Sequence, residues 1–110
     1  MWKNKNLNDI PDYVLIKWEV FELTINGLKS RHFIGDDVLS QQPKVSSPIV
    51  LFDNKKMLGC TRFKMIYRLM GTPSSHPDAS RVIHEWLENT GIACDNVEII
   101  SGDLVNKNSC

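Results

Sequence analysis

Apolar and polar residues alternate in the first third of the chain, and this alternation indicates a strand. From Val14 to Ile25 the alternation has a period of two, which is typical of a half-buried strand. Its phase changes in the middle, where Val20 and Phe21 are both apolar. A period of two cannot change faces without a bulge, a strong bend or burial of both faces. We therefore predict a bend or bulge near Val20–Phe21.

Asn26-Gly27 follows this strand and is the strongest hairpin signal in the chain. Both residues tolerate the positive φ of a type I′ turn. A two-residue loop at this point pairs Glu22 with Arg31, an opposite-charge pair that supports the register. The sequence therefore predicts a hairpin whose second strand covers residues 28–34 and is ended by a glycine.

The central part of the chain predicts further strands. Residues 36–44 are polar, and Pro43 disfavours sheet pairing, so we predict a loop there. The apolar run Ile49–Phe52 is suited to a central strand, and a four-residue turn at 53–56 follows it.

Residues 57–70 allow two interpretations. A tight turn at Phe63-Lys64 divides them into two strands, whereas a continuous strand would carry Gly59 as a bulge. We favour the turn, for a reason that depends on a family resemblance described below.

One segment shows helical periodicity. We predict a helix over about 77–90, with Ser75 or His76 as its cap, Pro77 in its first turn and Gly91 just past its end. The apolar residues follow the spacing of one buried face. They are Ala79, Val82, Ile83, Trp86 and Leu87.

These elements predict an α+β fold, an antiparallel sheet of four to six short strands covered on one face by a single helix. The last strand is expected over 97–100. With 110 residues, the chain is expected to form a single domain over 1–110, with a loose N-terminal arm (1–11) and a polar C-terminal tail (101–110).

The composition of the chain argues against several classes of function. The 13 basic and 13 acidic residues cancel, which argues against a general nucleic-acid binder. Cys60, Cys94 and Cys110 form no C-x-x-C pair, so we expect reduced thiols, no metal site and no cofactor. Neither a signal peptide nor a membrane-spanning run is recognisable, so we expect a cytoplasmic protein with no membrane partner.

Candidate chemistry is sparse, and we expect no catalytic residue. The three histidines are too far apart in sequence to form a local metal pair. His32 is expected to lie opposite Phe21, where it could contribute to a site. A nucleophile needs a neighbouring base. Cys60 is interpreted as a small buried residue, and Ser46-Ser47 as a turn or edge element.

Basic residues gather in the central stretch, and they suggest a contact surface. They are Lys55, Lys56, Arg62, Lys64 and Arg68. Solubilising charge on strand edges is the simpler explanation. A surface for an acidic protein or for nucleic-acid phosphates is the sharper one.

Three segments also carry a resemblance. RHFIG (31–35), VSSPIVLFD (45–53) and GCTRFKMIYRLMGTP (59–73) precede a predicted helix with Trp86. Their order and spacing resemble a family of small uncharacterised proteins of proteobacterial phages, prophages and mobile islands, with the pattern RHxxG, VSSxIVxFD and GxTxSGRxYxLxGxPG. Where that family has Ser-Gly-Arg, this chain has Phe63-Lys64-Met65, so a role of that arginine does not carry over. The resemblance favours the turn there and implies a compact phage or prophage accessory protein.

Two functions follow as hypotheses. The first is a non-enzymatic accessory protein that binds a host protein or complex, as anti-CRISPR and other anti-defence proteins do. Its binding residues are expected to be Arg31, His32, Arg62, Tyr67 and Arg68. The alternative is a small enzyme or nucleotide-ligand binder that uses His32, Ser46, Ser47 and Cys60 around a pocket between sheet and helix, or a nucleic-acid module. Nucleic acid is not the favoured partner, and homodimerisation is a further option.

Overall fold

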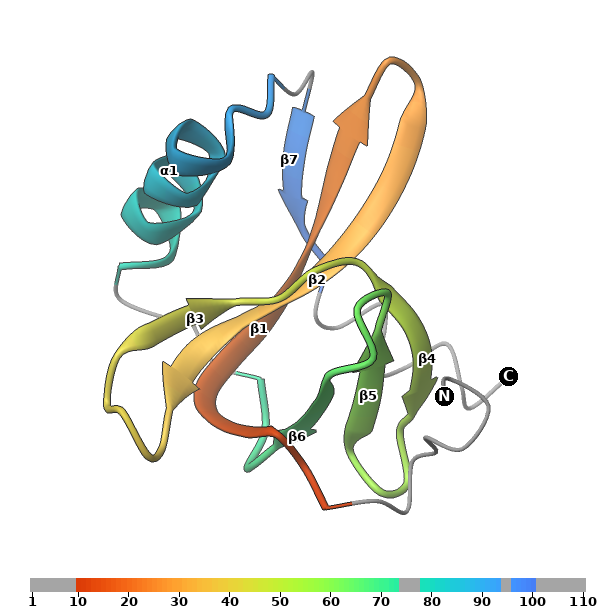
Figure 1. Cartoon of the computed structure of the whole chain (residues 1–110), viewed down its shortest axis with the longest axis vertical. Helices are drawn as coiled ribbons and strands as arrows, with labels where there is room; N and C mark the ends of the chain where they lie inside the picture. The colour runs from red at the N-terminus through yellow and green to blue at the C-terminus, as the bar shows by residue number, and fades with distance from the viewer. Residues whose placement is uncertain (1–9, 74–77, 94–95, 101–110) are drawn as a thin grey trace.

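The computed structural model describes residues 10–73, 78–93 and 96–100. It confirms the α+β class: within these ranges one helix accompanies a sheet of seven strands (Figure 1). The elements are β1 (Tyr13–Ile25), β2 (Leu28–Asp37), β3 (Pro43–Val45), β4 (Ile49–Asp53), β5 (Leu58–Thr61), β6 (Ile66–Leu69), α1 (Ala79–Thr90) and β7 (Asn96–Ile99).

The sheet differs from the prediction in the number, the length and the direction of its strands. Seven strands exceed the four to six expected, and β1 and β2 are long, with 13 and 10 residues. The strand order is β3-β2-β1-β6-β5-β4, and β7 also pairs with β1. The sheet is mixed rather than antiparallel, because β1 and β6 run parallel. The sequence does not reveal this pair, because β6 pairs with its sequence neighbour β5 on one side and with the distant start of β1 on the other.

The β1–β2 hairpin confirms its predicted register. Asn26 and Gly27 have φ values of 52° and 80°, as a type I′ turn requires. Glu22 lies opposite Arg31, and the arginine Nε is 3.2 Å from the carboxylate of Glu22. The second strand continues three residues beyond the expected end, to Asp37. Turn chemistry alone was therefore enough to place this half of the sheet.

The bulge in β1 lies closer to the N-terminus than predicted. The register shifts between Ile16 and Glu19, and Lys17 has a φ of 51°. Val20 and Phe21 instead lie in regular strand and are both fully buried. Of the three explanations for the change of phase, burial of both faces holds at this point. The sheet has separate apolar clusters on its two sides there, and each takes one of these residues.

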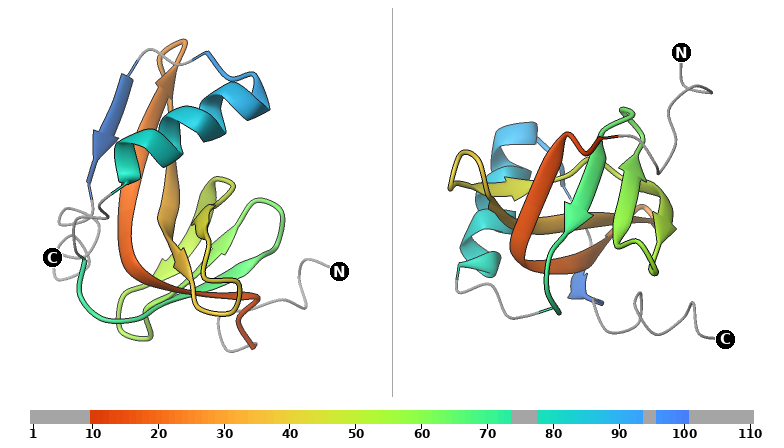
Figure 2. Two further views of the ribbon diagram at one scale, coloured as in Figure 1. Left: turned by 90° about the vertical axis from the view of Figure 1, so that its left-hand side faces the viewer. Right: turned by 90° about the horizontal axis from the view of Figure 1, so that it is seen from below.

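The two clusters organise the molecule. One packs β1 and β2 against β6 and has the buried members Leu15, Trp18, Val20, Phe33, Tyr67, Leu69 and Ile100. The other packs the hairpin against the helix and has the buried members Phe21, Leu23, Ile34 and Ile83. Figure 2 shows the helix beside the hairpin end of β1 and β2, with β4 to β6 toward their other end.

The helix has the predicted inner face. Its apolar side contacts the second cluster through the five residues expected, with Ile83 buried. Gly91 follows it in the left-handed region, with a φ of 71°. Asp78 is the N-cap, whereas the predicted caps and Pro77 lie outside the described residues. Within the described ranges, no helix is long and apolar enough to cross a membrane.

The turn at Phe63-Lys64 is confirmed. It separates β5 from β6, Lys64 has a φ of 68°, and the Thr61 N–H donates to the carbonyl of Met65 at 3.0 Å. The turn at 53–56 is also present, and the Asp53 carboxylate accepts the N–H groups of Lys55 and Lys56. Val45–Gly71 therefore contributes three complete strands.

Two further predictions for the middle of the chain were wrong. The run Ile49–Phe52 forms a strand at the end of the sheet order, not a central one. Pro43 lies inside β3, where it pairs with Asp36. β3 is the opposite terminal strand, and an edge position tolerates proline because one side of the strand needs no N–H donor.

Candidate functional site

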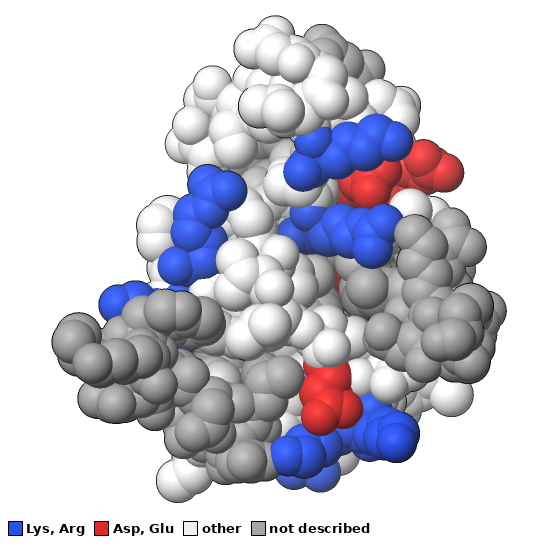
Figure 3. Space-filling model, turned by 90° about the vertical axis from the view of Figure 1, so that its right-hand side faces the viewer, with Lys and Arg blue, Asp and Glu red and all other residues white. Residues whose placement is uncertain are grey.

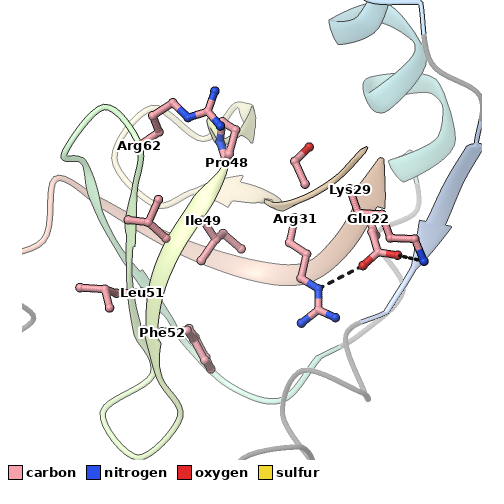
Figure 4. A pocket seen from close by; sticks show the side chains of 10 residues that line it. Glu22, Lys29, Arg31, Pro48, Ile49, Leu51, Phe52 and Arg62 are labelled. Atoms are coloured by element: carbon pink, nitrogen blue, oxygen red, sulfur yellow. Dashed lines mark hydrogen bonds and ion pairs between the residues drawn. The ribbon is translucent and has the colours of Figure 1, made fainter. Parts of the chain in front are cut away.

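Arg31 and Arg62, both predicted as binding residues, line one hollow. It has a volume of about 540 Å³ and lies between β2 and β4, and we call it the edge hollow. Residues 29–31 of β2 line one side and residues 48–52 line the other. In Figure 4, Arg62 extends above β4 and Arg31 extends from β2, with Ile49 between them and Phe52 farther down β4. Residues distant in sequence thus share one concave surface.

The edge hollow is basic. Among the residues that the structure describes, Lys29, Arg31 and Arg62 line it with a single acidic residue, Glu22. Glu22 binds the nearest two cations, at 3.2 Å from Arg31 and 3.7 Å from Lys29 (Figure 4). Figure 3 shows Lys and Arg side chains arranged around an uncharged surface on this side of the molecule. The hollow therefore presents excess positive charge beside apolar surface.

The other predicted contact residues lie elsewhere. Tyr67 is 2% exposed and its ring stacks on that of Tyr13 at 4.9 Å. Burial raises the pKa of Tyr67 above its ordinary value, so the hydroxyl stays neutral. Arg68 is exposed on β6 opposite Leu58, at the end of the β5–β6 hairpin away from Arg62. Arg68 lies opposite Leu58, and Arg62 follows Leu58 by four residues, so roughly 13 Å of strand separates the two arginines.

A second hollow lies next to the first, and we call it the apolar hollow. It has a volume of about 560 Å³ and is enclosed by the hairpin tip, the end of the helix and the turn at 62–63. Its apolar lining comes from Leu23, Ile25, Leu28, Pro48, Phe63, Trp86 and Ile92. The two hollows share four lining residues, Lys29, Ser30, Pro48 and Arg62. Arg62 and Ser30 therefore stand at the border between a charged and an apolar space.

His32 also lines the apolar hollow, and two aromatic rings and two hydrogen bonds hold its imidazole in place. The ring is 2% exposed, stacks on Phe21 at 5.2 Å and meets the edge of Trp86 at 5.1 Å. Its position opposite Phe21 was predicted and is confirmed. Nδ1 lies 2.8 Å from the carbonyl oxygen of Ser46, and Nε2 lies 2.8 Å from Oγ of Ser30.

The hydrogen bonds fix the tautomer of His32. A carbonyl oxygen can only accept, so Nδ1 carries the proton and donates it to Ser46. Nε2 then has a free lone pair and accepts the hydroxyl proton of Ser30. Burial lowers the pKa of His32 below its ordinary value, and the positive charge of Arg62 lowers it further, although the Ser46 bond opposes them. The imidazole is therefore neutral at physiological pH.

Ser46 and Cys60 have structural roles. The Ser46 hydroxyl is fully buried, accepts the N–H of Phe33 at 2.8 Å and donates to the carbonyl of Ser47 at 2.8 Å. It joins the segment after β3 to β2, as an edge element does. Cys60 is 1% exposed and its thiol contacts the carbonyl of Thr61, which agrees with its interpretation as a small buried residue. Cys94 and Cys110 lie outside the described residues.

The structure adds Ser30, which was not among the predicted site residues. The signal was present, because Ser30 and His32 are two residues apart in a strand and so lie on the same face. Ser30 was missed because only Cys60 and the Ser46-Ser47 pair were considered as nucleophiles. A search for serine or threonine two residues from histidine within a predicted strand would have found it.

The buried histidine predicts a pH-dependent stability. Because the folded pKa is lowered, the unfolded chain binds a proton first as the pH falls through its ordinary value of 6.5. Stability is therefore full above about pH 7 and declines below it, by up to about 1.4 kcal/mol per pH unit between the two pKa values. Urea unfolding at pH 7.5 and 5.5 measures this decline.

A non-titrating variant is the control. His32→Asn retains an N–H donor for the Ser46 carbonyl, so it should be less stable overall but lose less stability between pH 7.5 and 5.5. An equal loss in both proteins would show that another group causes the dependence.

Comparisons with known proteins identify no family for this chain, so its function is argued from the geometry of the site. No family model matches the chain, and neither the curated proteins nor the solved structures contain a significant match. The resemblance of residues 31–86 to phage and prophage proteins therefore stays a prediction. Among the described residues, no group of three or more His, Cys, Asp or Glu is placed to hold a metal ion.

Proposed function

We propose that this chain is a phage or prophage accessory protein that acts in the cytoplasm by binding a host protein through the edge hollow. The partner contributes an extended segment with apolar and carboxylate side chains. Binding blocks a component of host defence, in the manner of an anti-CRISPR protein. The observation that carries this proposal is that Arg31 and Arg62 line one hollow beside the apolar edge strand β4.

Charge supports an acidic partner. Arginine binds carboxylates through two parallel N–H donors and is enriched among residues that dominate interface energies. Arg62 is exposed at the rim and has no ion pair with another described residue. Arg31 is partly neutralised by Glu22, so Arg62 is the stronger candidate for the main contact.

The edge strand supports an extended segment. β4 is a terminal strand of the sheet, and one of its edges is unpaired within the described part of the chain. Val50 and Leu51 are each 49% exposed on it. Extended peptides add to such edges through main-chain hydrogen bonds, while side-chain contacts select the sequence. The edge hollow thus offers backbone pairing and charge recognition together.

Charge reversal at the rim tests the proposal. With the tagged full chain as bait in a host lysate, Arg62→Glu should reduce capture of the partner by roughly tenfold or more, because it places a carboxylate against the partner's own. Arg68→Glu is the matched control, since it makes the same change at an exposed strand position outside the hollow. That variant should capture the partner as well as the wild type.

Phage challenge of cells that express each protein gives a second measurement. The wild type and Arg68→Glu should increase phage infection of a defended host, and Arg62→Glu should not. Equal capture by Arg62→Glu and the wild type would contradict the proposal. So would failure of the wild type both to recover a host protein and to change infection.

A further inference from the structure

The apolar hollow contains a second arrangement of side chains whose geometry suits chemistry rather than protein binding. Three residues are connected by two hydrogen bonds, from Ser30 Oγ to His32 Nε2 and from His32 Nδ1 to the Ser46 carbonyl, each 2.8 Å long. A hydroxyl, a base that takes its proton and a group that orients the base are the parts of nucleophilic serine catalysis.

The histidine is rigidly positioned for this role. The Ser46 carbonyl fixes its tautomer, and Phe21 and Trp86 hold the ring from its face and its edge. Ser30 is half-buried and lines both hollows. Its hydroxyl is therefore oriented toward the base from a position at the border of open space. Preorganised geometry of this kind removes much of the entropic cost of the first chemical step.

The surroundings indicate the substrate class. Seven apolar residues, including Phe63 and Trp86, line a space of about 560 Å³, within the usual size of small-molecule sites. Arg62 lines the same space, and its positive charge contributes to lowering the pKa of the His32 imidazole. A guanidinium that lines the same space as the nucleophile can stabilise an oxyanion that develops on an acyl group.

We propose that Ser30 and His32 form a nucleophile–base dyad that hydrolyses small carboxylic esters with an apolar acyl group. The acyl chain occupies the apolar hollow, and the carbonyl oxygen faces Arg62. This activity goes beyond the proposed partner binding, because it depends on Ser30 and His32, although Arg62 lines both hollows and contributes to both proposals.

The proposed reaction balances with water as the sole co-reactant. Ser30 Oγ forms a bond to the ester carbon while its proton moves to His32 Nε2, and the carbonyl oxygen becomes an oxyanion beside Arg62. The intermediate collapses, its bond to the alcohol oxygen breaks, and the alcohol leaves with the proton from Nε2. Water then gives a proton to Nε2 and attacks the acyl-serine. Ser30 regains its proton as the carboxylic acid leaves.

The Ser46 carbonyl, which orients His32, allows a prediction of how fast the enzyme turns over. A neutral carbonyl stabilises the imidazolium less than the carboxylate of a full triad, so slow turnover is expected. Throughout, the Nδ1 proton stays on His32 and remains bonded to Ser46. Serine-reactive probes are therefore a better first readout than turnover, because they accumulate on the nucleophile.

Labelling with a fluorophosphonate, followed by peptide mass spectrometry, tests the dyad directly. The expected adduct is on Ser30, and Ser30→Ala should lose it together with roughly a hundredfold of p-nitrophenyl butyrate hydrolysis. Ser47→Ala is the matched control, because Ser47 lines the same hollow without a hydrogen bond from its hydroxyl to His32. It should keep both the adduct and the hydrolysis.

Several results would overturn the dyad. These are no adduct on Ser30, an adduct of equal yield on Ser47, or unchanged hydrolysis by a folded Ser30→Ala. His32→Asn removes the base and should also lose the adduct, but it should capture the partner as well as the wild type, because His32 is buried and does not line the edge hollow. The dyad and the partner surface can therefore fail separately.

Discussion

Replacing Gly59 by alanine is expected to destabilise the protein by about 3 kcal/mol, the upper end of the usual cost of overpacking a core. A Cβ at this position would lie 2.6 Å from Cε2 of Phe33 and closer still to its Cζ. It would also lie 3.3 Å from Phe52. Phe33 is fully buried and packs against Phe52 and Tyr67, so its ring cannot simply move aside.

Thermal unfolding measures this effect as a fall in melting temperature of roughly 10–15 °C. The double variant Gly59→Ala, Phe33→Leu identifies the cause. Leucine lacks the ring atoms that the new methyl would meet, so the double variant should be at least about 1 kcal/mol more stable than the two single effects predict by addition. Strict additivity, or a neutral Gly59→Ala, would contradict the close approach of β5 to β2.

Trp18→Ala is expected to cost about 4 kcal/mol, the range found when a large buried aromatic is truncated. Trp18 is fully buried beside the bulge in β1. Its indole N–H donates to the carbonyl of Gly71 at 3.1 Å and so joins the bulge to the segment after β6. Gly35 faces the same bulge, where an added Cβ would lie 3.1 Å from the Trp18 Cα.

Trp18→Phe separates packing from the hydrogen bond. Phenylalanine keeps part of the ring volume but has no donor for Gly71, so this variant should lose about half as much stability as Trp18→Ala. Urea unfolding of the three proteins gives the order. Equal losses in both variants would mean that the hydrogen bond, rather than the buried ring, dominates.

Local chemistry made the hairpin and the helix predictable. The Asn26-Gly27 turn sets the register of the two strands as far as the bulge, and the helix spacing indicates which residues face the sheet. The parallel pairing of β1 with β6 depends on contacts between distant segments, which periodicity does not encode. The position of the bulge was missed for a related reason. Two apolar clusters bury both faces of β1, so its change of phase does not mark the irregularity.

The candidate site was predictable only in part. Arg31 and Arg62 line one hollow because β2 and the end of β5 both lie near the apolar residues of β4. The sequence placed both arginines on strands or at their ends. Tyr67 faces inward, because its position in β6 packs on the Phe33 ring. Tyr67 was predicted as a binding residue only because tyrosine is common among residues that dominate interface energies. Ser30 was missed although strand periodicity places it beside His32.

The most direct test of the partner surface is site-specific photo-crosslinking. A photo-reactive amino acid replaces Val50 on the edge strand, and Met70 in a control protein. Both side chains are 49% exposed, but Val50 lines the edge hollow and Met70 does not. The proposal predicts a crosslink to a host protein from position 50 and none from position 70. Crosslinks of equal yield from both positions, or from position 70 alone, would contradict it.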